Sequence, residues 1–201
     1  KRDNHRKDRA MITQLEIKLK YQSEEKLNYN ISSVMHGILM GHIDRAYGER
    51  MHEDGLKPFV QEVCNIKEDE FIWRICTMTE EAKIQIIEPL MKMDQFYMKH
   101  RELRLKVCER NLKEISYDTL IENYYFEEQP RNITIKFCSP TAFKSQGNYI
   151  FMPTVRLIFQ SLIHKYDTFS SGTMVGSEET LEHIERYVIC LLYTSPSPRD
   201  M

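Results

Sequence analysis

The chain has 201 residues, of which 41% are hydrophobic and 29% charged, and its formal net charge is −2. This composition is typical of a globular protein with one large domain or two small ones. No apolar run approaches the ~18 residues that a membrane span requires, and no secretory signal is evident. The five cysteines include no Cys-x-x-Cys pair. This argues against a disulfide framework or a zinc site and favours a reducing cytoplasm.

The negative net charge does not by itself indicate a nucleic-acid-binding protein. The first ten residues, KRDNHRKDRA, are strongly basic, so the rest of the chain is more acidic than the whole. Any RNA-binding site must therefore be a local basic patch, because the overall charge repels a polyanion.

Both ends of the chain depart from the pattern between them. Met11 opens an alternating segment and is the expected natural start, so residues 1–10 are expected to be a non-native or disordered basic leader. After Val188 the sequence becomes ICLLYTSPSPRDM, and CLLYTSPSPRD resembles translated sequencing-adapter read-through. We therefore expect residues 190–201 to be an artefactual tail and the natural sequence to be cut short near residue 189.

The first predicted elements are a strand and a helix. Strict alternation of apolar and polar residues over 15–21 predicts a half-buried strand. An apolar stripe predicts a helix over about residues 32–46, with Asn30 or Ser32 as its N-cap.

This helix has two faces of interest. His42 falls at the centre of the apolar stripe, which predicts a structural role for it. His36, Met40 and Tyr47 lie opposite the stripe. They are expected to face away from the core if the helix lasts as far as residue 47.

Two strands are predicted next, at residues 59–66 and 71–78, separated by a charged turn. A helix follows, with a capping box formed by Thr77 and Glu80 and a kink at Pro89. Leu103, Leu105 and Val107 then alternate as in a strand. The order strand–helix–strand–strand–helix–strand predicts a ferredoxin-like domain over residues 11–118.

A second domain is predicted to begin in the same way and to occupy residues 119–189. Alternation at Ile133, Ile135 and Phe137 predicts a strand, and residues 148–152 predict another.

Two helices complete the predicted elements of this second domain. Pro153 suits the first turn of the first helix. Its buried face is expected to comprise Val155, Ile158, Phe159, Leu162 and Ile163. Leu181, Ile184 and Val188 predict the second helix.

The stretch MHEDGLKPF at residues 51–59 is the strongest functional signal. It places His52 five residues before Lys57 across a glycine turn. Metal-free RNA cleavage needs this combination: a group that moves a proton near neutral pH, and a cation for the charge on the reacting phosphate. A histidine and a lysine beside a surface turn are also common, so the motif draws support from a second stretch, SPTAFKSQGNYIFMPTVRLIFQSL at residues 139–162.

Together these two stretches resemble the CRISPR-associated endoribonucleases that cut precursor CRISPR RNA within its repeats, in the repeat-associated mysterious protein (RAMP) superfamily. The resemblance covers Met11 to about Val188. It implies an α+β fold of tandem ferredoxin-like (RRM-like) domains, of which the second is incomplete here. It also implies CRISPR repeat RNA as the substrate, and it allows a CRISPR effector complex as a further partner. The family includes monomers and dimers, so the oligomeric state stays open.

The resemblance further implies a reaction that needs no metal or cofactor. The ribose 2′-hydroxyl attacks the adjacent phosphorus and expels the 5′ oxygen, which yields a 2′,3′-cyclic phosphate and a 5′-hydroxyl. The family's catalytic histidine corresponds to His52, as general base or acid, and its lysine corresponds to Lys57, which would stabilise charge on the phosphate.

Other candidate site residues also follow from the resemblance. Some members carry a catalytic tyrosine on the first helix, where this chain has Met40, and Tyr47 or His36 could substitute for it. Lys144 and Arg156 could bind RNA phosphates. The family's glycine-rich loop near the C-terminus has no counterpart in this sequence.

Two other readings stay open at this point. A RAMP protein could bind RNA without cutting it, as a subunit of a CRISPR effector complex. A ferredoxin-like protein-interaction or small-ligand module is more distant. It would suit the negative charge but leaves the match at residues 139–162 unexplained.

Overall fold

The computed structural model describes residues 11–23, 27–28, 30–53, 55–135, 137, 143–145, 147–150, 152, 154–170, 172 and 174–190. The predictions for residues 1–10, for Pro153 and for the tail beyond residue 190 lie outside this set. The chain divides into two compact units, which are described separately. The first unit is Lys1–Pro140 with Phe169–Gly172, and the second is Thr141–Thr168 with Thr173–Met201.

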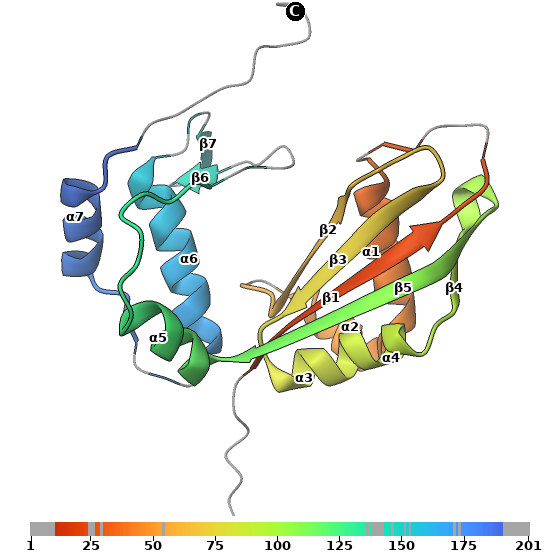
Figure 1. The fold of residues 1–201 in the computed structure, drawn as a ribbon, viewed down its shortest axis with the longest axis horizontal. Coiled ribbons are helices and arrows are strands. Elements are labelled where there is room, and N and C mark those ends of the chain that lie inside the picture. The colour runs from red at the N-terminus through yellow and green to blue at the C-terminus, as the bar shows by residue number, and fades with distance from the viewer. Residues whose placement is uncertain are drawn as a thin grey trace, which may run out of the picture. The chain divides into compact units, whose positions relative to one another are not determined.

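The first unit is built on a five-stranded antiparallel sheet (Figure 1). Its strands are β1 (Met11–Lys20), β2 (Phe59–Cys64), β3 (Glu70–Thr77), β4 (Gln95–Met98) and β5 (Leu103–Ser116). The order across the sheet is β2-β3-β1-β5-β4. Without β4 this is the ferredoxin-like arrangement, so the predicted α+β class is confirmed.

The helices of the first unit come mainly from the two crossover connections. They are α1 (Ile31–His42), α2 (Arg45–Arg50), α3 (Glu80–Ala82), the π-helical η1 (Lys83–Ile87), α4 (Glu88–Met91), the 3-10 turn η2 (Lys99–Arg101) and α5 (Tyr117–Tyr125). Alternate residues of β1 and β3, among them Leu15 and Trp73, are fully buried, and Met35 and Leu39 of α1 join the same core. The alternation predicted for β1 is therefore confirmed.

The first predicted helix ends earlier than expected, which changes the position of Tyr47. α1 stops at His42, and the Asp44 side chain accepts a hydrogen bond from the backbone N–H of Tyr47 at 3.0 Å, so a new helix begins at Arg45. The change of direction buries Tyr47 in the core. The expectation that Tyr47 faces away from the core is wrong, whereas His42 has the structural role predicted, with its ring Nδ1 2.7 Å from the Ile38 carbonyl oxygen.

The second crossover also departs in detail from the prediction. Thr77 is the last residue of β3 and is buried, so it cannot cap the helix. The side chain of Thr79 does so instead, by accepting from the Ala82 N–H at 3.1 Å. Pro89 follows the π-helical turn η1, where its missing N–H is accommodated.

The second unit contains a hairpin and two helices. These are β6 (Phe143–Ser145), β7 (Asn148–Ile150), α6 (Val155–Phe169) and α7 (Glu178–Tyr187). β7 and both helices were predicted, but no described residue among 133–137 belongs to a strand, so that prediction is wrong. No residue of α6 is fully buried. In its expected buried face Leu162 is exposed, and the other four residues are only half-buried.

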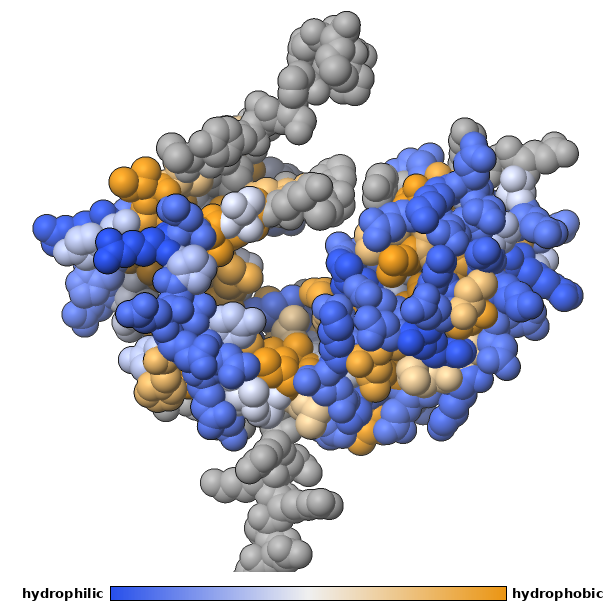
Figure 2. Space-filling view, in the orientation of Figure 1, coloured by the Kyte–Doolittle hydropathy of each residue, from blue (hydrophilic) through white to orange (hydrophobic). Residues whose placement is uncertain are grey.

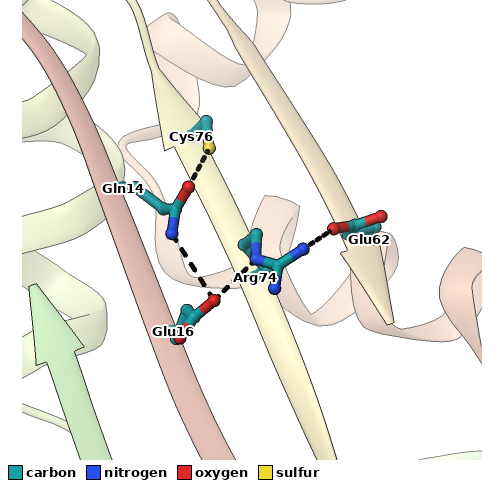
Figure 3. Close-up of polar contacts among 5 residues, drawn as sticks. All are labelled: Gln14, Glu16, Glu62, Arg74 and Cys76. Atoms are coloured by element: carbon teal, nitrogen blue, oxygen red, sulfur yellow. Dashed lines mark hydrogen bonds and ion pairs between the residues drawn. The ribbon is translucent and has the colours of Figure 1, made fainter. Parts of the chain in front are cut away.

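The sheet face away from α1 carries polar side chains. At its centre Arg74 of β3 donates to Glu16 of β1 at 2.7 Å and also contacts Glu62 of β2 (Figure 3). Gln14 and Cys76 extend this network. On the side of the first unit that Figure 2 shows, hydrophilic residues predominate. We call the sheet face away from α1 the open face.

Candidate functional site

His52 and Lys57 lie in one turn between α2 and β2. His52 is exposed, and its backbone N–H donates to the Glu49 carbonyl at 3.0 Å as α2 ends. Gly55 takes a φ of +117°, which L side chains rarely adopt. Lys57 is half-buried, and its ammonium donates to the Glu53 carbonyl of the same turn. The imidazole and the cation are thus presented by a single short segment.

The start of β2 anchors this turn to the sheet. The Pro58 carbonyl accepts a hydrogen bond from the Met78 N–H at 2.8 Å, and Phe59 pairs with Thr77. The Phe59 ring is buried. These contacts fix the chain immediately after Lys57 to the end of β3.

His36 reaches the same region from α1. Its ring stacks on Phe59 with 6.1 Å between the ring centroids and 8° between the planes. The imidazole is half-buried, and no described residue hydrogen-bonds to its ring nitrogens. His36 therefore lies beside Phe59, two residues after Lys57, and so close to the turn.

Tyr47 lies close in sequence but is withdrawn from the surface. Its exposed fraction is 2%, and its hydroxyl has no hydrogen-bond partner among the described residues. Burial, together with the nearby Glu81 carboxylate, raises the pKa of Tyr47 to about 12. A buried phenol of this kind neither reaches a bound RNA nor gives up its proton near neutral pH, so we do not assign Tyr47 to the site.

Arg50 was not anticipated from the sequence. Its guanidinium forms an ion pair with Glu81 of α3 and lies 5.1 Å from the centroid of the Tyr47 ring. The pair fastens the end of α2, and hence the start of the His52 turn, to the second crossover. Arg50 and Glu81 are 31 residues apart, and no local pattern connects them.

Lys144 and Arg156 both belong to the second unit. The Lys144 ammonium is exposed and lies 4.7 Å from the centroid of the Tyr149 ring. Arg156 instead bridges α6 to α7 through ion pairs with Glu178 at 2.6 Å and Glu185 at 3.0 Å. The guanidinium of Arg156, which was expected to bind RNA phosphates, is therefore already paired with two carboxylates.

Metal-ligand clusters and membrane-spanning helices are both missing from the part of the chain that the structure describes. No group of three or more His, Cys, Asp or Glu side chains is arranged to hold a metal ion. None of the helices described there is long and apolar enough to cross a membrane.

Sequence comparison relates the chain to one family. The sequence model for CRISPR-associated endoribonuclease Cas6 matches residues 135–191. The Mycobacterium tuberculosis protein of that name is 30% identical over 183 residues, which cover 88% of this chain and 57% of the relative. The Streptococcus thermophilus protein is 30% identical over 152 residues, which cover 76% of this chain and 62% of that relative. The chain therefore spans about three fifths of the length of these curated relatives.

Solved structures share the fold. Thermus thermophilus Cas6 superposes with a TM-score of 0.63 at 18% identity, covering 88% of this chain and 69% of that one. A Cas6 product complex gives a TM-score of 0.64 at 19% identity, covering 81% and 66%. At this level of identity the likeness concerns the fold alone, and it extends over both units of the chain.

Proposed function

We propose that the chain belongs to the Cas6 family of CRISPR-associated endoribonucleases and that the whole protein cuts CRISPR repeat RNA. The observation that carries the proposal is the turn between α2 and β2. It presents an exposed imidazole, His52, and an ammonium group, Lys57, from one segment. The names of the relatives support the same class of reaction.

In the proposed mechanism the ribose 2′-hydroxyl attacks the adjacent phosphorus and the 5′ oxygen leaves. The P–O bond to the 2′ oxygen forms as the P–O bond to the 5′ oxygen breaks, which gives a 2′,3′-cyclic phosphate and a 5′-hydroxyl. One proton leaves the 2′ oxygen and one reaches the 5′ oxygen. An imidazole is suited to either transfer because it changes charge near neutral pH.

His52 is proposed for one of these proton transfers, and His36 is the candidate for the other. His36 is favoured over Tyr47 because its ring is half-buried beside Phe59, whereas the Tyr47 hydroxyl is enclosed. Lys57 is proposed to stabilise the negative charge on the non-bridging oxygens. An ammonium group has three donors, so its bond to the Glu53 carbonyl leaves two for the phosphate.

The test is cleavage of a labelled repeat RNA in EDTA by the full-length protein from its own locus. His52→Ala should lower the single-turnover rate by on the order of 10²-fold or more and leave RNA affinity near normal. His164→Ala is the matched control, because His164 is an exposed histidine on α6, outside the turn. Cleavage by His52→Ala at the wild-type rate would remove His52 from the mechanism.

A second candidate function is RNA binding without cleavage, as a subunit of a CRISPR effector complex. The burial of Tyr47 favours it, since a third catalytic group expected on the surface is withdrawn into the core. The same experiment separates the two functions. Tight binding of the repeat with no cut product would support the binding subunit.

A further inference from the structure

The hairpin of β4 and β5 concentrates positive charge in an acidic protein. Residues 92–106, KMDQFYMKHRELRLK, contain five Lys or Arg and two acidic residues, in a chain whose net charge is −2. None of these cations belongs to the turn that carries His52 and Lys57.

Most basic side chains elsewhere in the described chain are neutralised by carboxylates. Ion pairs of this kind hold Lys18, Arg45, Arg50, Lys67, Arg74, Lys83, Arg110 and Arg156. Lys99, Arg104 and Lys106 of the hairpin, by contrast, have no ion-pair partner in the part of the chain that the structure describes.

The strand register aligns these cations on the open face. Arg104 of β5 lies opposite Tyr97 of β4, and Lys106 lies opposite Lys20 of β1. Lys20, Arg104 and Lys106 are all exposed. Like charges directly opposite each other destabilise a sheet. Lys20 also lies opposite Glu70 of β3, but Glu70 already pairs with Lys18 and Lys67. A bound anion would therefore relieve the repulsion between Lys20 and Lys106.

A hollow accompanies this row of charge at the edge of the sheet. It has a volume of about 690 Å³, and Tyr97, Lys99 and Arg104 are among its lining residues. The Tyr97 side chain is 48% exposed, although it lies between cationic neighbours. The Glu102 carboxylate also lines the hollow, so an anion is expected to bind on the side of Lys99 and Arg104.

We propose that Lys20, Tyr97, Lys99, Arg104 and Lys106, here called the basic corner, bind the phosphate backbone of single-stranded RNA. The cations would pair with phosphates, and the Tyr97 ring would offer a surface on which a base stacks. The inference rests on the proposed function. It adds a contact site for the RNA strand beyond the cleaved phosphate. An acidic protein partner would use the cations but gives no role to the exposed ring.

The test measures the affinity of the full-length protein for a fluorescent repeat RNA over a range of salt concentrations. Arg104→Gln/Lys106→Gln should weaken binding and reduce the slope of log K against log[salt] by about 1.4, because each phosphate contact to a single strand contributes about 0.7. Tyr97→Ala should weaken binding about tenfold. Lys113→Gln is the matched control, because Lys113 is exposed on the same strand opposite Gln14.

Thermal unfolding gives a second measurement. Lys106→Gln should leave Tm unchanged or raise it, because the repulsion from Lys20 is removed. A fall in Tm would contradict the reading of this pair as strained by repulsion.

The outcomes separate this inference from the proposed function. Wild-type protein that neither binds nor cuts the repeat would overturn both. Wild-type cleavage together with unaltered affinity and salt slope in Arg104→Gln/Lys106→Gln would overturn the basic corner alone. If that variant bound RNA normally but lost an acidic protein subunit, the surface would belong to a protein partner, and the inference would again be wrong.

Discussion

Tyr47 shows how a single buried residue restricts the chemistry of the turn. The Tyr47 ring packs in the core, and the guanidinium of the neighbouring Arg50 forms an ion pair with Glu81. The enclosed hydroxyl has no described partner. A buried hydroxyl that makes no hydrogen bond costs free energy, so the residue is not optimal for stability. Its aromatic ring is the part that the fold uses.

Tyr47→Phe should therefore preserve or slightly raise stability, by up to about 1 kcal/mol. It should leave the cleavage rate at the wild-type value. The measurements are urea unfolding at neutral pH and the cleavage assay described above. A loss of cleavage with normal folding would show that the hydroxyl takes part in catalysis after all.

The same substitution should change stability at high pH. A tyrosine in the unfolded chain ionises near pH 10, whereas burial raises the pKa of Tyr47 to about 12. The unfolded state alone releases this proton between these values, so the wild-type protein loses stability as pH rises from about 10 to 12. Tyr47→Phe should show a smaller loss over this range.

At the scale of elements, periodicity identified several segments correctly, although the alternation at Ile133, Ile135 and Phe137 corresponds to no described strand. The alternation in β1 and the apolar spacing in α1 and α7 each identified the right element, because burial of one face imposes that period. The end of α1 was not predicted. The apolar stripe continues past it, while the Asp44 cap starts a new helix. β4 was missed because four residues are too few to show a period.

In the candidate site, too, some features could be predicted from the sequence and others could not. His52 and Lys57 are neighbours in sequence, so their shared turn could be predicted from the motif alone. The contacts of His36 with Phe59 and of Arg50 with Glu81 join segments that are far apart. They depend on how α1, β2 and α3 pack, and no spacing rule on one segment reveals them.

The connection between α6 and α7 depends on a glycine. The Asp167 carboxylate accepts hydrogen bonds from the backbone N–H groups of Val175 at 2.8 Å and Gly176 at 2.9 Å. A Cβ at Gly176 would lie 2.4 Å from Asp167 Oδ2 and 2.8 Å from Ile163 Cγ2. A side chain fits there only if the Asp167 carboxylate and the Ile163 methyl group move, which would strain the two hydrogen bonds of Asp167.

Gly176→Ala should destabilise the α6–α7 pair by about 1–3 kcal/mol, the usual cost of breaking hydrogen bonds to a charged group. Chemical denaturation monitored by circular dichroism measures the loss. Asp167→Ala and the double variant complete a mutant cycle. The two substitutions should be clearly non-additive, since each removes the same contacts. Additive losses would mean that Gly176 is needed for another reason.

At the scale of the whole molecule, charge is distributed in two different ways. The centre of the open face pairs Arg74 with Glu16 and Glu62, so its charges are satisfied within the fold (Figure 3). At the edge formed by β4 and β5, no ion pair among the described residues involves Lys99, Arg104 or Lys106. Net charge describes neither region, which is why a net charge of −2 is compatible with a local surface for a polyanion.

Packing is also uneven between the two units. The first has a continuous core that includes Leu15, Trp73 and Ile75, all completely buried. In the second unit α6 has no fully buried residue, and its Leu162 is 55% exposed. Leu181 of α7 is buried. Because apolar burial is the main source of stability, the two units should differ in their free energy of opening.

Native-state hydrogen exchange on the 201-residue chain tests this difference. Amides of β1 and β3 should exchange through global unfolding of the first unit, with a strong dependence on urea. Amides in the middle of α6 should exchange at least about tenfold faster and with a weaker dependence, because they open locally. Equal rates and equal urea dependence in α6 and β1 would instead mean that the chain unfolds as a single cooperative unit, despite the exposed face of α6.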